Sequence, residues 1–153
     1  MKISEKRELY IKQIEAHFID LDKSLDALFY SYKKCESIEE KKECSLDELE
    51  IFEALSARFA RSSDILTQKV IKSLVLLLQE NMNTIIDTAN FLEKLEIIEN
   101  AHDLINIREL RNQIAHDYVA ADLNALYDDV LAYTPKLKAI TKNLKNYYNK
   151  TFL

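Results

Sequence analysis

The chain has 153 residues, of which 48% are hydrophobic, with one proline and no glycine, and its formal net charge is −5. This length suits one domain with one core, and the lack of glycine excludes Gly-rich phosphate loops and disfavours hairpins, so an all-α fold is expected. The negative charge argues against coating nucleic acid by bulk electrostatics, so any contact with phosphate must be local.

Two long amphipathic helices are predicted in the first half of the chain. The first spans about residues 3–33, where apolar side chains recur every three or four residues: Tyr10, Ile14, Phe18, Leu21, Leu25, Leu28 and Tyr32. A charged connection follows. Ser45 and Glu48 then form a capping-box pattern, which begins a second helix that runs to about Glu80.

Three more helices are predicted in the second half. Asn81 and Asn83 are expected to end the second helix, because asparagine is the best substitute for a C-terminal glycine in this chain. A third helix is expected at about 84–97 and a fourth from residue 101. The last begins near Asp122 as N-cap. Pro135 either kinks this helix, which we prefer, or starts another helix capped by Thr134.

The predicted fold is therefore all-α, an up-and-down bundle of about five helices with a long kinked C-terminal helix, in a single domain over 1–153. The longest apolar run is LVLLL at 74–78, which is too short to cross a membrane, and the N-terminal stretch MKISEKRELY has no apolar leader. We therefore expect a soluble, cytoplasmic protein with no membrane association.

The two cysteines, Cys35 and Cys44, have no nearby histidine and no second cysteine pair, so they do not complete a zinc ligand set. A disulfide between them is not expected in a reducing cytosol. No metal or other cofactor is expected, and the sequence assigns the thiols no role.

The stretch RNQIAHDY, residues 111–118, gathers arginine, asparagine, histidine and tyrosine in a chain otherwise rich in helix formers. On a continuous helix Arg111 and His116 would point about 140° apart, so they converge only if the helix loosens near Ala115. An N-cap at Asp122 favours such a corner over 116–121. In a purely structural interpretation, Arg111 pairs with a surface carboxylate, His116 ends a helix and Tyr118 packs the corner.

RNQIAHDY resembles the Arg-x4-His-x-Tyr motif of the HEPN superfamily, in particular the HepT-like toxins that pair with a minimal nucleotidyltransferase (MNT) antitoxin. Arg111, His116 and Tyr118 match the named positions, and Asn112 matches the polar residue that commonly follows the arginine. The order of the helices is similar too, with the motif at the turn before a long last helix, so the resemblance covers most of the chain.

The resemblance implies a metal-independent ribonuclease toxin that cleaves RNA, with tRNA among the candidate substrates. Arg111 would bind the phosphate, Asn112 would support it, and His116 would act as general acid or base, a role that its unperturbed pKa permits. Because one histidine does not readily serve as both, we expect a homodimer with a composite site at its interface. The resemblance also implies that the MNT partner silences the toxin by transferring AMP to Tyr118.

Two further features bear on this interpretation. The stretch ARFARSSDIL at 57–66 resembles a sister group, the nucleotidyltransferase substrate-binding proteins, which implies the alternative of a non-catalytic partner with the same bundle. The other feature is two basic stripes. They either serve only solubility, as charges on exposed helix faces usually do, or flank the cleft of the expected dimer and attract phosphate. Their members are Arg58, Arg61, Lys69 and Lys72 in the second helix and Lys138, Lys142 and Lys145 near the C-terminus.

Overall fold

The computed structural model describes residues 2–38, 44–116 and 123–153. In these ranges the chain is entirely helical between its connections. The elements are α1 (Ile3–Glu36), α2 (Leu46–Ile65), the π-helix η1 (Leu66–Ile71), α3 (Lys72–Leu77), α4 (Ile85–Lys94), α5 (Ala101–His116) and α6 (Leu123–Phe152). The segment α2–η1–α3 has helical backbone throughout, so it forms one long helix and the described chain has five helices in all, as predicted.

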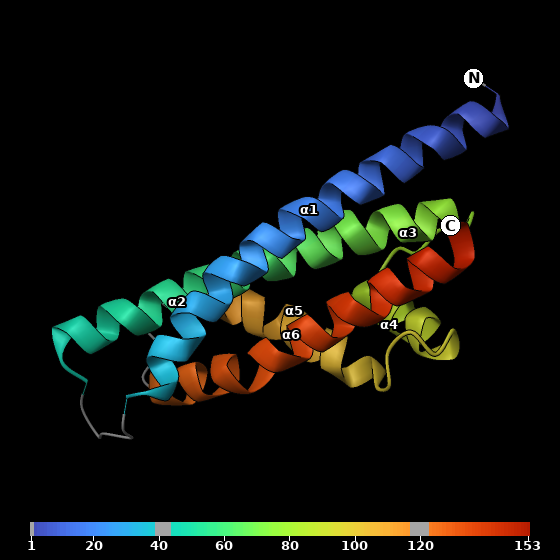
Figure 1. Cartoon of the computed structure of the whole chain (residues 1–153). Coiled ribbons are helices and arrows are strands. Elements are labelled where there is room, and N and C mark those ends of the chain that lie inside the picture. Colours follow the sequence, from blue (N-terminus) through green and yellow to red (C-terminus); the bar gives the residue numbers. More distant parts are fainter. Residues whose placement is uncertain (1, 39–43, 117–122) are drawn as a thin grey trace.

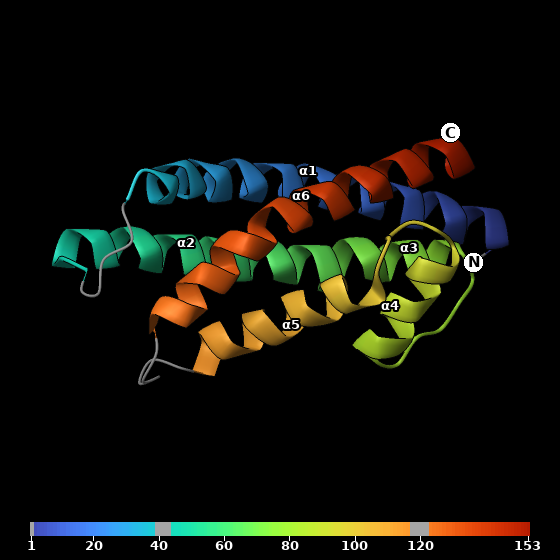
Figure 2. The ribbon, with the colours of Figure 1, turned by 90° about the horizontal axis from the view of Figure 1, so that it is seen from below.

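The four long helices form an up-and-down bundle. α1 and α5 run one way, while α2–η1–α3 and α6 run the other way, and the short α4 covers one end (Figures 1 and 2). α2 contacts α1, α5 and α6, and α6 also contacts α1 and α5. This arrangement places α1 and α5 on opposite sides of the α2–α6 pair. The α2–α5 seam and the α1–α6 seam therefore lie on different faces of the molecule.

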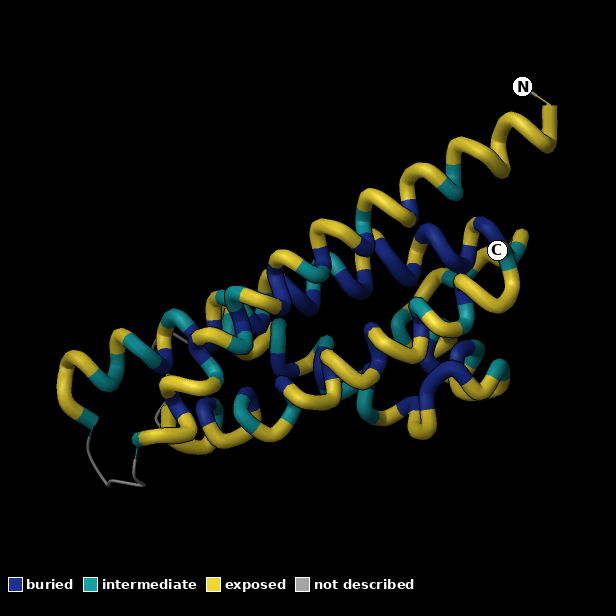
Figure 3. The backbone as a smooth tube through the Cα atoms, viewed as in Figure 1, coloured by how far each residue is buried: buried dark blue, intermediate teal, exposed yellow. Residues whose placement is uncertain are grey.

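The core consists of the inward stripes that the periodicity predicts. Ile14, Leu55, Phe59 and Leu104 are fully buried, and the buried positions in Figure 3 line the inner side of each helix. Burying a side chain of this size contributes about 1.5–3 kcal/mol to the stability of the fold, so these stripes hold the bundle together. By contrast, residues 2–9 at the N-terminal end of α1 are all exposed, and this end of α1 extends past the other helices in Figure 3.

The start of α2 confirms the predicted capping box. The Ser45 hydroxyl accepts from the Glu48 backbone N–H at 3.2 Å, and the Glu48 carboxylate accepts from the Ser45 N–H at 3.1 Å. Thr84 caps α4 in the same position, where its hydroxyl accepts from Asp87 N–H. α1 extends to Glu36, three residues past the predicted end.

The predicted end of the second helix was wrong. α3 stops at Leu77, and the left-handed residue is Gln79 at φ 59° rather than Asn81 or Asn83. The N–H of Glu80 then donates to Val75 O and that of Gln79 to Leu76 O, which is a Schellman motif. α4 ends likewise, with Glu96 at φ 61°, so it is shorter than predicted. Without glycine, ordinary residues accept the left-handed conformation at a cost of about 1–2 kcal/mol each.

α6 confirms the prediction of one long C-terminal helix. Pro135 lies inside it, and the Thr134 hydroxyl donates to Val130 O at 2.7 Å instead of capping a new helix. α6 bends along its length in both views (Figures 1 and 2), and a proline inside a helix is the usual cause of a bend. The predicted N-cap, Asp122, lies outside the described residues.

Candidate functional site

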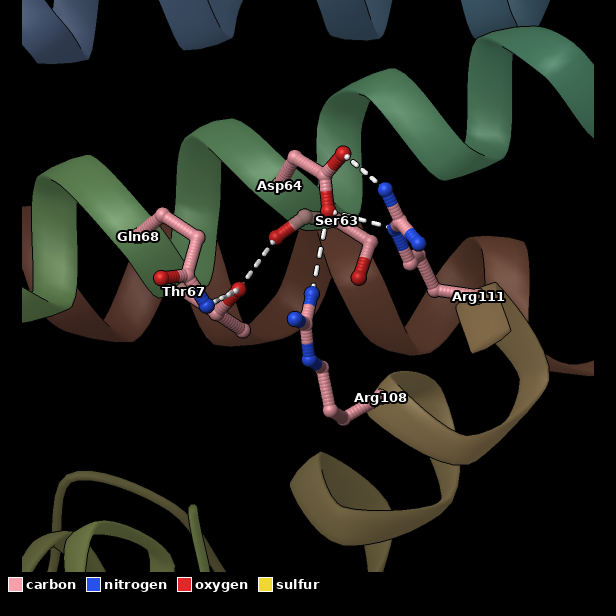
Figure 4. A network of polar contacts seen from close by, with 6 residues as sticks. All are labelled: Ser63, Asp64, Thr67, Gln68, Arg108 and Arg111. Atoms are coloured by element: carbon pink, nitrogen blue, oxygen red, sulfur yellow. Dashed lines mark hydrogen bonds and ion pairs between the residues drawn. The ribbon is translucent and has the colours of Figure 1, made fainter. Parts of the chain in front are cut away.

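An ion cluster joins α2 to α5. Asp64, at the end of α2, accepts from both nitrogens on one edge of Arg111, Nε at 2.7 Å and Nη2 at 3.0 Å, and from Arg108 Nη1 at 3.0 Å (Figure 4). The two arginines are three positions apart on α5 and so lie on one side of the helix. We call Asp64, Arg108 and Arg111 the arginine cluster.

The arginine cluster has an excess of positive charge and of hydrogen-bond donors. Two guanidinium groups share one carboxylate, which leaves one net positive charge. Among the described residues, Arg111 Nη1 and the Nε and Nη2 atoms of Arg108 have no acceptor. The side chains of Arg108 and Arg111 are 26% and 28% exposed, so both guanidinium-bearing side chains are partly open to solvent. The hydrogen bond to Asp64 raises the pKa of Arg111 further, which keeps it charged.

The helix beneath the cluster departs from α geometry. Thr67 lies in the π-helix η1, and its hydroxyl donates to Ser63 O, near the end of α2, at 2.9 Å. The Ser63 hydroxyl is buried and has no hydrogen-bond partner among the described residues, and in Figure 4 it points to the side from which the arginines approach. A short π-helical turn often marks a functional site, and a buried hydroxyl without a partner costs free energy. Both features lie next to Asp64.

His116 and Asn112, the other described residues of the predicted site, are exposed on α5. The expected loosening of the helix near Ala115 was wrong, because α5 continues to His116. Residues 112–116 contain neither glycine nor proline, and alanine is the strongest helix former, so nothing in this stretch unwinds the helix. Arg111 and His116 of one chain therefore point about 140° apart and do not converge. Tyr118 lies outside the described residues.

The basic stripes do not form one surface around the cluster. Arg58 donates to Ala27 O at 3.0 Å and to the Ser31 hydroxyl at 2.9 Å, so it joins α2 to α1. Arg61 is exposed on α2, whereas Lys69 lies in η1 and Lys72 begins α3. Because a π-helix has more residues per turn than an α-helix, the two lysines do not keep the direction around the helix axis that a regular α-helix would give them. The C-terminal lysines line a groove between α1 and α6 instead, with Asp22 and Asp26.

Cys35 and Cys44 are separate free thiols. Cys35 is buried, and burial raises the pKa of its thiol to about 11, which leaves little nucleophilic thiolate near neutrality. Cys44 is a free, partly exposed thiol. Within the described ranges no three His, Cys, Asp or Glu side chains are grouped to hold a metal ion, and no helix there is long and apolar enough to cross a membrane.

Sequence reasoning missed Arg108 and Asp64. The spacing of Arg108 and Arg111 within RELR could have identified the arginine pair, because residues three apart lie on one helix face. Asp64 carries no such pattern. Its pairing depends on how α2 packs on α5, which only the tertiary structure defines.

Comparisons with protein-family models, curated proteins and solved structures found no match to this chain. The resemblance to HEPN proteins therefore rests on the RNQIAHDY motif and on the order of the helices.

Proposed function

We propose that this protein is a metal-independent ribonuclease toxin of the HEPN type, which acts in the cytoplasm and is silenced by a nucleotidyltransferase antitoxin. The observation that carries the proposal is the arginine cluster: the motif arginine Arg111 lies beside a second arginine, both side chains are partly exposed with unused donors, and the cluster has one net positive charge. Planar guanidinium groups match phosphate oxygens in pairs, so this cluster suits one phosphate of an RNA strand.

The reaction assigns each group a step. A base takes the proton of a ribose 2′-hydroxyl, and the 2′-oxygen attacks the adjacent phosphorus. The bond to the 5′-oxygen breaks, and an acid protonates that oxygen. The products are a 2′,3′-cyclic phosphate and a 5′-hydroxyl, and no water or metal is consumed. Arg108 and Arg111 stabilise the negative charge that gathers on the non-bridging oxygens of the phosphate, Asn112 adds a hydrogen bond, and His116 moves the protons.

The regular end of α5 supports a dimeric site. Because Arg111 and His116 of one chain point in different directions, a single copy does not bring its own histidine to the phosphate that its arginine binds. A two-fold dimer that apposes two copies of α5 would supply two histidines to one cleft, one as base and one as acid. Mixed dimers with one His116→Ala subunit should then have far less than half of the wild-type activity.

Tyr118 is the proposed point of control. The partner, with ATP, would transfer AMP to the Tyr118 hydroxyl and release pyrophosphate. The new phosphodiester carries a negative charge, which the free donors of Arg108 and Arg111 can bind in place of RNA. Intact mass spectrometry should show additions of whole AMP units to the wild type and none to Tyr118→Phe, and RNA cleavage should fall as the modified fraction rises.

One observation favours a second candidate function, a non-catalytic partner of a nucleotidyltransferase. Asp64 occupies a full edge of Arg111, as it would if the arginine only joined two helices. In that case the protein would bind the nucleotidyltransferase and would leave RNA intact.

Incubation of purified protein with total tRNA in the presence of a metal chelator distinguishes the two functions. The proposal predicts cleavage by the wild type and a loss of about 10²- to 10⁴-fold in His116→Ala, the usual contribution of a general acid or base. His102→Ala is the matched control, because His102 is also exposed on α5 but lies in its first turn. Equal rates for wild type and His116→Ala, or no cleavage by either, would refute the ribonuclease proposal.

A further inference from the structure

A pocket of about 260 Å³ lies along η1 and α3, beyond the arginine cluster in the direction of the chain. It lies between η1 and α3 on one side and the 79–84 connection and the start of α4 on the other. Gln68, one of its lining residues, is one turn beyond Asp64, about 6 Å along the helix axis. Thr67, which also lines the pocket, follows Asp64 by three residues, so the pocket begins about one helical turn from the carboxylate that binds Arg108.

The rim of the pocket carries amide side chains with unused hydrogen-bonding capacity. Asn81 and Asn83 have no hydrogen-bond partner among the described residues, and Gln68 donates only one long bond, from Nε2 to the Thr67 hydroxyl at 3.5 Å. An amide side chain offers a donor and an acceptor side by side. This pair matches the edge of a nucleobase, as in the bidentate contacts that Asn and Gln make to adenine.

The floor of the pocket is apolar. Ile71 and Val75 are buried beneath it, and Met82 lies partly exposed on the opposite wall. A methionine thioether packs favourably against aromatic rings, so this wall together with the apolar floor suits a flat heterocycle. The volume is just under the range of roughly 300–1,000 Å³ for drug-sized ligands, which fits a single ring system.

The pocket and the arginine cluster differ in net charge, and this difference indicates which part of an RNA strand each would bind. The pocket carries one lysine and one glutamate, Lys72 and Glu80, and so has no excess charge, whereas the cluster beside it has one net positive charge. A neutral pocket with amide groups suits a base, and the charged cluster suits the adjoining phosphate. We propose that this pocket binds one unpaired nucleobase of an RNA strand whose neighbouring phosphate contacts Arg108.

This inference rests on the proposed function, and it makes the protein a reader of single-stranded RNA. A base that is paired in a duplex presents neither its full edge nor its face, so the strand must be unpaired at this position. Cleavage should therefore occur in loops and at ends rather than in helical stems.

Binding of short RNA to the His116→Ala protein tests the proposal, because this protein retains the cluster and the pocket without consuming RNA. A single-stranded oligomer is compared with oligomers that lack one base at each position in turn, by fluorescence anisotropy. Removal of one particular base should weaken binding about 5- to 150-fold, the effect of losing one bidentate contact between an amide side chain and a base edge. Gln68→Met and Asn83→Leu should weaken binding of the intact oligomer but not of the oligomer that lacks that base.

Gln13→Met is the matched control, because Gln13 is exposed on α1 and does not line the pocket. Equal affinity for the intact and all base-free oligomers, with affinity still lost in Arg111→Ala, would overturn the base pocket and leave the ribonuclease proposal standing. Equal weakening of both kinds of oligomer by Gln68→Met would also overturn it. No binding of any oligomer would overturn both proposals together.

Discussion

The α2–α5 seam and the α1–α6 seam both carry ion pairs, yet they differ in how charges are matched. Across α1 and α6, the Lys145 ammonium contacts both oxygens of Asp22, at 2.5 and 2.6 Å. Neither Lys138 nor Lys142 in the same groove shares this carboxylate among the described contacts, so this pair has one cation and one anion. Across α2 and α5, two arginines share Asp64 and keep donors unused. Both seams are partly exposed, so burial does not explain the difference.

This comparison separates a contact that holds helices together from one that is also available to a ligand. A matched and partly exposed pair contributes about 0–1 kcal/mol to stability and leaves no charge for a further partner. An excess arginine adds little to stability and repels its neighbour, and under the proposed function its role is to bind an anion. Equivalent substitutions in the two seams should therefore have different effects.

Removal of the motif arginine should have the largest effect. Arg111→Ala should lower the rate of tRNA cleavage by about 10²- to 10³-fold, as expected for loss of one group that stabilises charge in the transition state. Arg111→Lys should recover only part of this rate, because lysine keeps the charge but lacks the planar fork. Lys145→Ala in the other seam should cleave at the wild-type rate, and an equal loss in both seams would contradict the comparison.

Removal of the shared carboxylate should have a smaller and more selective effect. Asp64→Asn leaves two like charges next to each other without the group that orients them, so kcat should fall about 10- to 100-fold from misplacement of the phosphate. RNA affinity should stay the same or rise, because a negative charge has been removed. A role in stability alone would instead leave the kcat of the folded protein unchanged.

Asp22→Asn is the matched variant in the α1–α6 seam. It should lower the free energy of unfolding by about 0–1 kcal/mol, given that Asp22 is half exposed, and leave kcat and RNA affinity unchanged. Chemical denaturation and the tRNA assay measure the two quantities.

A change that appears only at alkaline pH is expected in the α1–α6 seam. Burial and a hydrogen bond to Glu15 raise the pKa of Tyr148 to about 12. The folded protein therefore holds this proton more tightly than the unfolded chain, so the resulting stability is complete below pH 10 and is lost as the pH rises toward 12. Denaturation midpoints should fall more steeply over this range in the wild type than in Tyr148→Phe. Parallel profiles would contradict the assignment.

The sequence predicted the helices well, because their information is local. The apolar stripes of α1 and α2 and the Ser45–Glu48 capping box act over one to a few turns, and each occurs in the structure. The helix ends at Gln79 and Glu96 were not predicted, since in a chain without glycine many residues can take the left-handed position. The π-helix likewise has no simple sequence pattern.

The candidate site was predicted only in part, because half of it depends on packing between helices. The motif identified Arg111, Asn112 and His116 on α5, and the structure places them there. The directions of Arg111 and His116 depend on the regular end of α5. The roles of Arg108 and Asp64 depend on the contact between α5 and α2. Tyr118 remains a prediction from the motif.

The salt dependence of RNA binding tests most directly whether the arginine cluster is a phosphate site. The affinity of the His116→Ala protein for single-stranded RNA is measured across a range of salt concentrations, alone and with Arg108→Ala, Arg111→Ala or Lys145→Ala added. Each phosphate contact adds about 0.7 to the slope of log affinity against log salt, so each arginine variant should lower the slope by about that amount while Lys145→Ala leaves it unchanged. Unchanged slopes in both arginine variants would contradict the account and assign the cluster to helix packing.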